Sequence, residues 1–299
     1  MLQTKNRQET ITNENTIDPK TGLGYVELTV PDLARSLPFY REVLGFKLHK
    51  REGGIARLGA GGDDLLVLKE NPEAKRPAFA TGLYHFAILV PSRLELARSL
   101  KQMADMGTAF QGFADHAVSE AIYLADPDGN GIEIYRDRPR QEWYDTLGRL
   151  RMTTEPLDVD GILRELERDE HKWSGLNKDT VLGHMHLQVS SVKPAEAFYR
   201  SVLGMGLMMN WGTASFVSAG GYHHHIGMNI WNSAGAPPPP PDSSGLLYFT
   251  IKLPNAGALA RVADRVHTAG QPLTETDEGL AVSDPSGNGI VLTVDEEVR

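Results

Sequence analysis

The sequence of 299 residues contains no cysteine. This absence excludes disulfide bonds, thiolate catalysis and zinc sites built on cysteine, and it is what a reducing cytosol permits. Any metal ion in this protein must therefore be held by His, Asp or Glu side chains.

The sequence also lacks a long apolar segment. Residues 1–20 are polar, and no stretch approaches the roughly 18 uninterrupted apolar residues of a membrane span. We therefore expect a cytoplasmic protein with no membrane partner, and a flexible N-terminus over residues 1–22.

A surplus of positive charge is missing as well. The chain carries 30 Lys and Arg against 39 Asp and Glu, which gives a formal net charge of -9, and the two signs are interleaved along the chain. A basic surface for the phosphates of DNA or RNA is therefore not expected, and nucleic acid is excluded as a partner.

A repeated pattern divides the chain into two similar halves. Residues 30–45 (VPDLARSLPFYREVLG) are echoed by residues 189–204 (VSSVKPAEAFYRSVLG), and residues 126–132 (DPDGNGI) by residues 284–290 (DPSGNGI). Because both echoes lie at nearly the same distance along the chain, we interpret the halves as duplicates.

Each half divides once more, since residues 84–90 and 247–253 resemble the starts of the two halves in their alternating pattern. Each of the four units begins with a strand, continues with an amphipathic helix and ends with strands separated by glycines. The expected helices cover residues 32–44, 92–106, 193–203 and 256–269.

The pattern predicts an α+β fold of four βαβββ units, in which concave mixed sheets close around cavities, because one unit needs a second to close its concave face. The expected domains cover residues 23–135 and 181–299, two units each. Residues 136–180, rich in charge, are expected to form a connector with one helix.

Strand alternation indicates which side chains face a cavity. In residues 184–189 the apolar side chains alternate with His184, His186 and a glutamine, so the histidines should face the concave side. At the corresponding position the four units carry Tyr25, His85, His184 and Tyr248, so only units two and three offer an imidazole.

The last strands of the second and fourth units also differ. After the repeated DPxGNGI motif, unit two has Glu133 and unit four has Val291. A single His or Glu on a strand usually has a structural role, but here three stand at corresponding repeat positions. His85, His184 and Glu133 are therefore predicted metal ligands that leave coordination positions open, which suits iron(II), although zinc or manganese accept the same ligands.

Residues 116–133 carry a longer motif around this glutamate. His116, the pair Ile122-Tyr123, the run Asp126-Pro127-x-Gly129 and the closing Glu133 resemble the signature of type I extradiol dioxygenases in the vicinal-oxygen-chelate superfamily. Ala114 departs from that signature, which has Gly, Asn, Thr, Ile or Val there. The chain as a whole resembles the bacterial catechol-2,3-dioxygenase branch.

The resemblance implies roles for several residues. Glu133 would be an iron ligand, and Tyr123 and His116 would lie near the substrate and oxygen. The family also carries a pair of histidines on a strand, one of them an acid/base. Residues 222–226 (YHHHI) are similar to that strand, and His224 is the expected acid/base, whereas His223 and His225 are expected to belong to a polar loop or an adventitious metal site.

The implied reaction is the opening of a small catechol-type aromatic diol by O2 at an iron(II) centre, with manganese(II) as an alternative ion and a homo-oligomer as a possible assembly. Because the ligands fall in units two and three, we expect these two units to form the active pocket. Units one and four should then form a metal-free pair around Tyr25, Tyr248 and Val291.

Two alternatives stay open at the level of sequence. One is a glyoxalase-like or other metal-dependent lyase or transferase of the same fold. A glyoxalase would want a second carboxylate within residues 222–231, which contain none. The other is a metal-free small-molecule binding protein, which has no need of two histidines and a glutamate in register.

Overall fold

The computed structural model describes residues 15–169 and 171–295. The flexibility expected for residues 1–22 falls mostly outside this part. Unit one comprises β1 (Gly22–Val30), α1 (Leu33–Pro38), β2 (Lys47–Glu52), β3 (Ile55–Gly59) and β4 (Asp64–Glu70). Unit two comprises β5 (Gly82–Leu89), α2 (Arg93–Asp105), β6 (Phe110–Asp115), β7 (Ser119–Ala125) and β8 (Gly131–Asp137).

The second half repeats this order. Unit three comprises β9 (Val181–Gln188), α4 (Val192–Ala197), β10 (Gly206–Asn210), β11 (Ala214–Ser218) and β12 (Ile226–Asn229). Unit four comprises β13 (Gly245–Leu253), α5 (Ala256–Thr268), β14 (Thr274–Thr276), β15 (Gly279–Ser283) and β16 (Gly289–Val294). The predicted α+β fold of four βαβββ units is confirmed, and the predicted helices begin and end close to the observed ones.

The units combine across the halves into two curved, mixed sheets of eight strands. The 1–4 sheet has the order β14-β15-β16-β13-β1-β4-β3-β2, and the 2–3 sheet has the order β10-β11-β12-β9-β5-β8-β7-β6. In each sheet the first strands of two units pair antiparallel, β1 with β13 and β5 with β9. The predicted pairing of unit two with unit three is therefore confirmed, while the assignment of domains to the two sequence halves stays a prediction.

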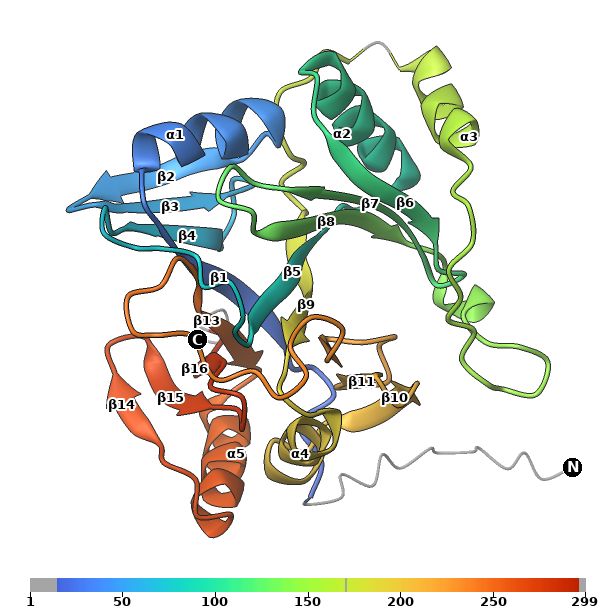
Figure 1. Ribbon diagram of the computed structural model, residues 1–299. Coiled ribbons are helices and arrows are strands. Elements are labelled where there is room, and N and C mark those ends of the chain that lie inside the picture. Colours follow the sequence, from blue (N-terminus) through green and yellow to red (C-terminus); the bar gives the residue numbers. More distant parts are fainter. Residues whose placement is uncertain (1–14, 170, 296–299) are drawn as a thin grey trace, which may run out of the picture.

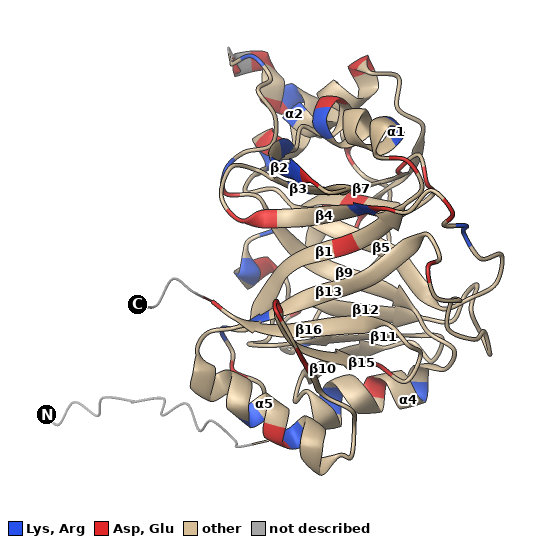
Figure 2. Cartoon of the chain, turned by 90° about the vertical axis from the view of Figure 1, so that its left-hand side faces the viewer, with Lys and Arg blue, Asp and Glu red and all other residues tan. Residues whose placement is uncertain are grey.

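The helices lie at the two ends of the molecule, with α1 and α2 together at one end and α4 and α5 at the other (Figures 1 and 2). Charged residues gather on the helices and loops, whereas the strands carry few (Figure 2). The side chains of Met185, Leu187 and Val189, which alternate with the histidines of β9, are fully buried in the apolar core.

Helix starts follow the usual capping chemistry. The hydroxyl of Ser92 accepts a hydrogen bond from the Glu95 amide at the start of α2, and the Asn255 side chain accepts one from the Ala258 amide at the start of α5. Helices α1 and α4 each continue into one π-helical turn, over Phe39–Val43 and Phe198–Val202. Both turns begin with the repeated Phe-Tyr pair.

The two repeated motifs, the segment with Phe-Tyr and the DPxGNGI segment, contact each other in space. The buried Tyr40 hydroxyl donates a hydrogen bond of 2.6 Å to the Asp126 carboxylate, and Tyr199 repeats the contact with Asp284 at 3.2 Å. Each contact joins a unit of one sheet to a unit of the other. The repeated motifs therefore hold the two sheets together, and burial raises the pKa of both aspartates.

The connector packs on unit two. Its helix α3 (Val159–Arg164) lies beside α2 (Figure 1), where Arg93 of α2 donates to the Gly161 carbonyl and pairs with Glu165. Nearer its start, Glu155 exchanges two backbone hydrogen bonds with Asp115 at the end of β6. The connector thus passes along the edge of the 2–3 sheet.

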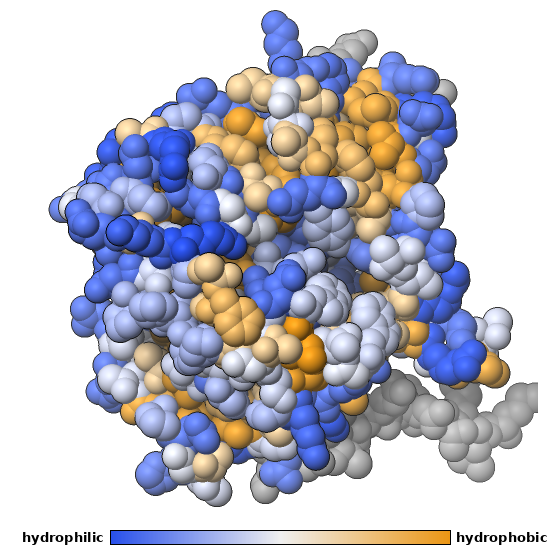
Figure 3. Space-filling view, in the orientation of Figure 1, coloured by the Kyte–Doolittle hydropathy of each residue, from blue (hydrophilic) through white to orange (hydrophobic). Residues whose placement is uncertain are grey.

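The outer surface is mixed in character. Hydrophilic side chains cover much of the face in Figure 3, and apolar ones gather toward its upper right, where α2 and α3 lie in Figure 1. Among the helices of the described residues, none is long and apolar enough to cross a membrane.

We expect Tyr40→Phe to lower the free energy of unfolding by about 1–3 kcal/mol, because the buried Asp126 carboxyl loses a hydrogen-bond donor. Urea denaturation of the full-length protein measures this change. Tyr144→Phe, which alters a partly exposed ring, should change stability little. Equal stability of Tyr40→Phe and the wild type would contradict the proposed link between the sheets.

Candidate metal centre

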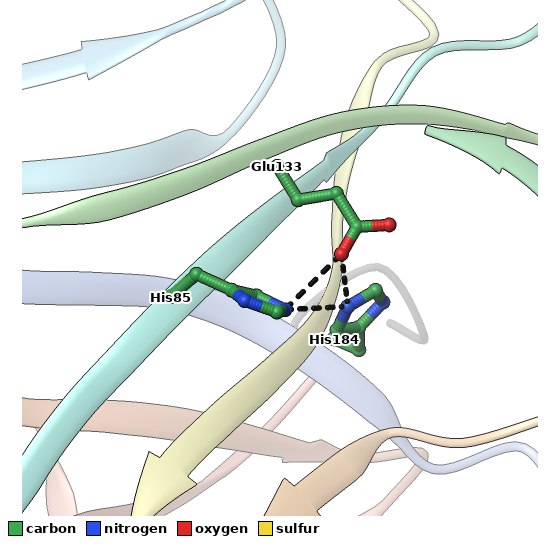
Figure 4. A group of neighbouring side chains, drawn as sticks. All are labelled: His85, Glu133 and His184. Atoms are coloured by element: carbon green, nitrogen blue, oxygen red, sulfur yellow. Dashed lines mark hydrogen bonds and ion pairs between the residues drawn. The ribbon is translucent and has the colours of Figure 1, made fainter. Parts of the chain in front are cut away.

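Three neighbouring strands bring the predicted ligands together on the concave face of the 2–3 sheet. Glu133 of β8 and His184 of β9 both lie opposite Ala87 of β5, one on each side, and His85 stands two residues before Ala87. Ala87 is fully buried. Its small side chain leaves room above this row, and the three predicted ligands point toward one another there (Figure 4).

The three ligand atoms form a nearly regular triangle. The Nε2 atoms of His85 and His184 lie 3.3 Å apart, and each lies 3.1 Å from Oε2 of Glu133. Ligand atoms about 2.1 Å from one ion would be about 3.0 Å apart at right angles and about 3.4 Å apart at tetrahedral angles. The observed spacing fits one ion bound to all three atoms.

The chemistry of the donor set also fits a cation. All three side chains are buried, and among the described residues they form the one group of His, Asp and Glu placed to hold a metal ion. Two imidazole nitrogens face each other and the same carboxylate oxygen, so hydrogen bonds alone cannot satisfy all three contacts. A cation between the atoms would resolve this conflict.

Protonation favours the same conclusion. Burial by itself raises the pKa of Glu133, but His184 and His85 outweigh it and hold the pKa well below its usual value. Burial lowers the pKa of His184 to about 4, against the opposing effect of Glu133. At neutral pH the site therefore presents a carboxylate and a neutral His184, which are the forms that bind metals.

His116 and Tyr123 lie beside this group and contact each other. The Nδ1 atom of His116 is 2.7 Å from the Thr153 carbonyl and must donate to it, so Nε2 accepts the hydrogen bond of 2.7 Å from the Tyr123 hydroxyl. Burial and the nearby Glu133 raise the pKa of Tyr123 well above its usual value. The phenol is therefore neutral and oriented by His116.

The three adjacent histidines do not belong to a strand, which corrects the expectation for residues 222–226. Strand β12 begins only at Ile226, and residues 222–225 form an irregular segment before it. The His224 ring packs on His184, with the ring centres 4.1 Å apart. His225 accepts a hydrogen bond from the Ala219 amide, and His223 is fully buried.

A cavity of about 430 Å³ opens over the candidate metal centre. The three candidate ligands and His116, Tyr123, His186 and His224 line it, and so do the connector residues Met152 and Thr154. Trp211 and Trp231 line it while each stays nearly half exposed. The cavity therefore combines polar groups in its depth with large aromatic rings at its opening.

His186 is held differently from the candidate ligands. Its Nε2 accepts a hydrogen bond from the Asn229 amide, 3.1 Å away, and its ring lies between those of His85 and Trp231. Burial lowers the pKa of His186 well below its usual value. The residue is a neutral part of the wall, held by a neighbouring strand.

The 1–4 sheet has a different group at the corresponding place. Tyr25 and Tyr248 stand where the 2–3 sheet has His184 and His85, and their hydroxyl oxygens lie 3.0 Å apart. The Tyr25 hydroxyl donates to Glu278 and that of Tyr248 to Glu27, while the buried Val291 replaces the glutamate. Neutral phenols with carboxylate acceptors satisfy one another there.

Several residues of the site were not among the predicted ones. Ala87 forms the floor, the Thr153 carbonyl orients His116, and Asp137 lies 2.9 Å from Nε2 of His223. Only Asp137 had a usable signal, because it follows Glu133 by four residues on the same strand and so shares its face. Every residue has a backbone carbonyl, so the role of the Thr153 carbonyl could not be predicted from residue type.

We expect Gly183→Ala to destabilise the protein by about 1–3 kcal/mol through overpacking. Gly183 lies at an irregularity in the β5–β9 pairing, and an added Cβ would stand 1.9 Å from the Tyr135 hydroxyl oxygen. Gly206→Ala on an edge strand is the control, since its new Cβ meets only an ordinary contact at 3.6 Å. Thermal unfolding compares the two, and equal melting temperatures would contradict the close packing at Gly183.

Comparisons with known proteins agree with this geometry. The family described as the Glyoxalase/Bleomycin resistance protein/Dioxygenase superfamily matches residues 22–134 and 181–292. The chain is 48% identical over 284 residues to a catechol-2,3-dioxygenase of Bacillus subtilis (strain 168), which covers 93% of this chain and 99% of that protein. It is 29% identical over 120 residues to a lactoylglutathione lyase of Neisseria meningitidis serogroup A, covering 37% of this chain and 87% of the relative.

A solved structure shows the same fold. Glyoxalase I from Zea mays superimposes with a TM-score of 0.56 at 17% identity, covering 91% of this chain and 92% of that one. At this low sequence identity, the superposition shows only that the two chains share a fold. From the family match over both halves and the full-length relative, we conclude that the chain belongs to the glyoxalase/bleomycin resistance protein/dioxygenase superfamily.

Proposed function

We propose that this protein is an extradiol ring-cleaving dioxygenase, which opens a catechol-type aromatic diol with O2 at a metal ion held by His85, His184 and Glu133. The observation that carries the proposal is the triangle of these three ligand atoms at the base of an aromatic-lined cavity. The near full-length similarity to a catechol-2,3-dioxygenase supports it.

The proposed ion is iron(II), with manganese(II) as an alternative for the same ligands. When bound, a metal with one face of ligands supplies open positions for both diol oxygens and O2 and a path for electrons between them. His85, His184 and Glu133 would occupy the remaining face, since their ligand atoms already have the mutual spacing that one ion requires.

The other side chains of the cavity act on the substrate. We assign His224 the role of base, since its ring borders the cavity beside His184, and burial lowers its pKa well below the usual value, so that the imidazole is neutral and able to accept a proton. The neutral Tyr123 hydroxyl donates its hydrogen bond to His116, so its oxygen can accept a hydrogen bond from a diol hydroxyl. These residues hold the diol and receive its proton at one end of the cavity.

The aromatic rim contributes orientation. Trp231 packs edge-on against Tyr84, with ring centres 5.3 Å apart, and Trp211 packs in the same way on Phe216 at 4.9 Å. Such rings favour flat aromatic ligands through offset or edge-to-face contacts. The cavity therefore suits an aromatic ring whose two oxygens reach the metal centre.

We expect the anaerobically purified, iron(II)-loaded protein to convert catechol to a yellow ring-opened product. Glu133→Gln should lower metal affinity by about 100-fold or more and abolish the product. Loss of a residue that only hydrogen-bonds to a ligand typically lowers metal affinity by about 10–100-fold, and loss of the ligand itself should cost more. Metal analysis and absorbance spectroscopy measure both. His184→Ala should behave in the same way, because His184 supplies a ligand to the same ion from the second half of the chain.

Glu278→Gln is the matched control, because this carboxylate lies in the 1–4 sheet beside Tyr25. It should keep both metal and turnover. Full metal content and activity in Glu133→Gln would refute the assigned ligand. Isomerisation of a glutathione hemithioacetal without cleavage of catechol would instead favour a glyoxalase-like reaction.

We expect Tyr123→Phe to keep the metal ion but lower kcat for catechol by about 10–100-fold, because the hydroxyl that contacts His116 is not a ligand. Steady-state kinetics with parallel metal analysis measure the two effects. Tyr25→Phe makes the same chemical change in the 1–4 sheet and should leave kcat unaltered. A loss of metal in Tyr123→Phe would argue against its separate role.

A further inference from the structure

A line of hydrogen-bonded groups leads from Asp137 to the cavity. Oδ1 of Asp137 lies 2.9 Å from Nε2 of His223, and Nδ1 of His223 lies 2.8 Å from Nδ1 of His224. His223 is fully buried, whereas the His224 ring borders the cavity. The proposed reaction uses His224 but gives no role to Asp137 or His223.

The chemistry of the groups fixes the direction of these bonds. A carboxylate only accepts, so Nε2 of His223 carries a hydrogen and, in the neutral ring, Nδ1 is an acceptor. Nδ1 of His224 must then carry the hydrogen that lies between the two rings. Its Nε2 is left with a free lone pair, and within residues 15–169 and 171–295 this atom has no hydrogen-bond partner.

The surrounding structure holds Asp137 in place. Glu133, Tyr135 and Asp137 alternate along β8 and share one face of the sheet. Tyr135 and Tyr222 share a hydrogen bond of 2.7 Å, and the Tyr222 hydroxyl donates to Oδ1 of Asp137 at 3.2 Å. The strand that supplies the proposed ligand Glu133 therefore also supplies and orients this carboxylate.

Packing covers His223, the middle of the line, whereas the Asp137 side chain stays 24% exposed. The Tyr222 ring stacks on His223 with centres 4.1 Å apart, and Trp143 of the connector packs on the same ring at 5.0 Å. Trp143 is almost completely buried. Water therefore cannot compete for the ring nitrogens of His223, which strengthens the hydrogen bonds that they make.

We propose that Asp137 is a positioning residue that acts through His223, fixing the tautomer and orientation of His224 so that the Nε2 lone pair faces the substrate. This inference rests on the proposed function, in which His224 receives the proton of the diol. The arrangement follows the logic by which a carboxylate holds the tautomer of a catalytic imidazole, here from a partly exposed position and through one additional ring.

A merely structural role for Asp137 makes a different prediction. An anchor for residues 222–225 would need a hydrogen bond to His223 but would be indifferent to which nitrogen of His224 carries the hydrogen. The tautomer of His224 therefore separates the two explanations. Asp137→Asn tests it, because the amide has nearly the same shape but no charge and can turn either its oxygen or its nitrogen to Nε2 of His223, so the two hydrogen bonds lose their fixed direction.

The tautomer can be read by long-range 15N–1H NMR of histidine-labelled, full-length protein loaded with Zn²⁺, a diamagnetic ion that accepts the same ligands. In the wild type we expect the hydrogen of His224 on Nδ1 alone, and in Asp137→Asn a second population with the hydrogen on Nε2. In the iron-loaded enzyme kcat should fall about 10–100-fold in Asp137→Asn, with KM for catechol within about twofold. Asp160→Asn, which removes an exposed connector charge, should alter neither.

Two results would overturn the proposal. One is a wild-type His224 with its hydrogen on Nε2, and the other is an Asp137→Asn protein that keeps both the tautomer and kcat of the wild type. The NMR experiment needs no turnover, so it decides the role of Asp137 even if catechol is not cleaved. Cleavage of catechol with the wrong wild-type tautomer would refute this inference and leave the proposed function intact.

Discussion

The antiparallel pairing of β5 with β9 is the contact on which the site depends. It joins the two halves of the chain and sets His184 opposite Ala87, with His85 opposite His186. Because side chains alternate along a strand, a slip of one residue would turn every ligand on one strand to the wrong face. The candidate metal centre therefore exists only when units two and three pair in this register, and neither half contains it alone.

The same pairing in the 1–4 sheet shows what the fold does without the ligand set. Tyr25 and Tyr248 meet as neutral phenols whose protons reach Glu278 and Glu27. In the triangle of His85, His184 and Glu133, by contrast, two imidazole nitrogens meet at one carboxylate oxygen. One sheet thus carries phenols, each with its own carboxylate acceptor, while the other brings three metal-binding atoms to one point.

Much of the fold and of the candidate site could be predicted, because the duplication of units and the alternation along strands are visible in the order of residue types. The repeat positions predicted His85, His184 and Glu133, and the unequal fourth unit predicted which units would pair. What could not be predicted depends on contacts distant in sequence. The irregular segment before β12, the Thr153 carbonyl and the cover provided by Trp143 all arise from how the connector and the loops fold back onto the 2–3 sheet.

His184 illustrates how packing replaces a hydrogen bond at the centre of the site. A histidine ligand usually donates its second ring nitrogen to a partner, which fixes the ring. Nδ1 of His184 is buried, and within the described part of the chain nothing accepts from it or donates to it. The ring instead lies between Tyr135, with centres 4.9 Å apart, and His224, at 4.1 Å.

Both neighbours of His184 belong to the network around Asp137. Tyr135 reaches that carboxylate through Tyr222, and His224 reaches it through His223. The orientation of the ligand from the second half therefore depends on a group at the end of β8, the strand that supplies Glu133 from the first half. A single strand thus places one ligand directly and a second through packing, which is why the close fit at Gly183 and the burial under Trp143 matter to the metal centre.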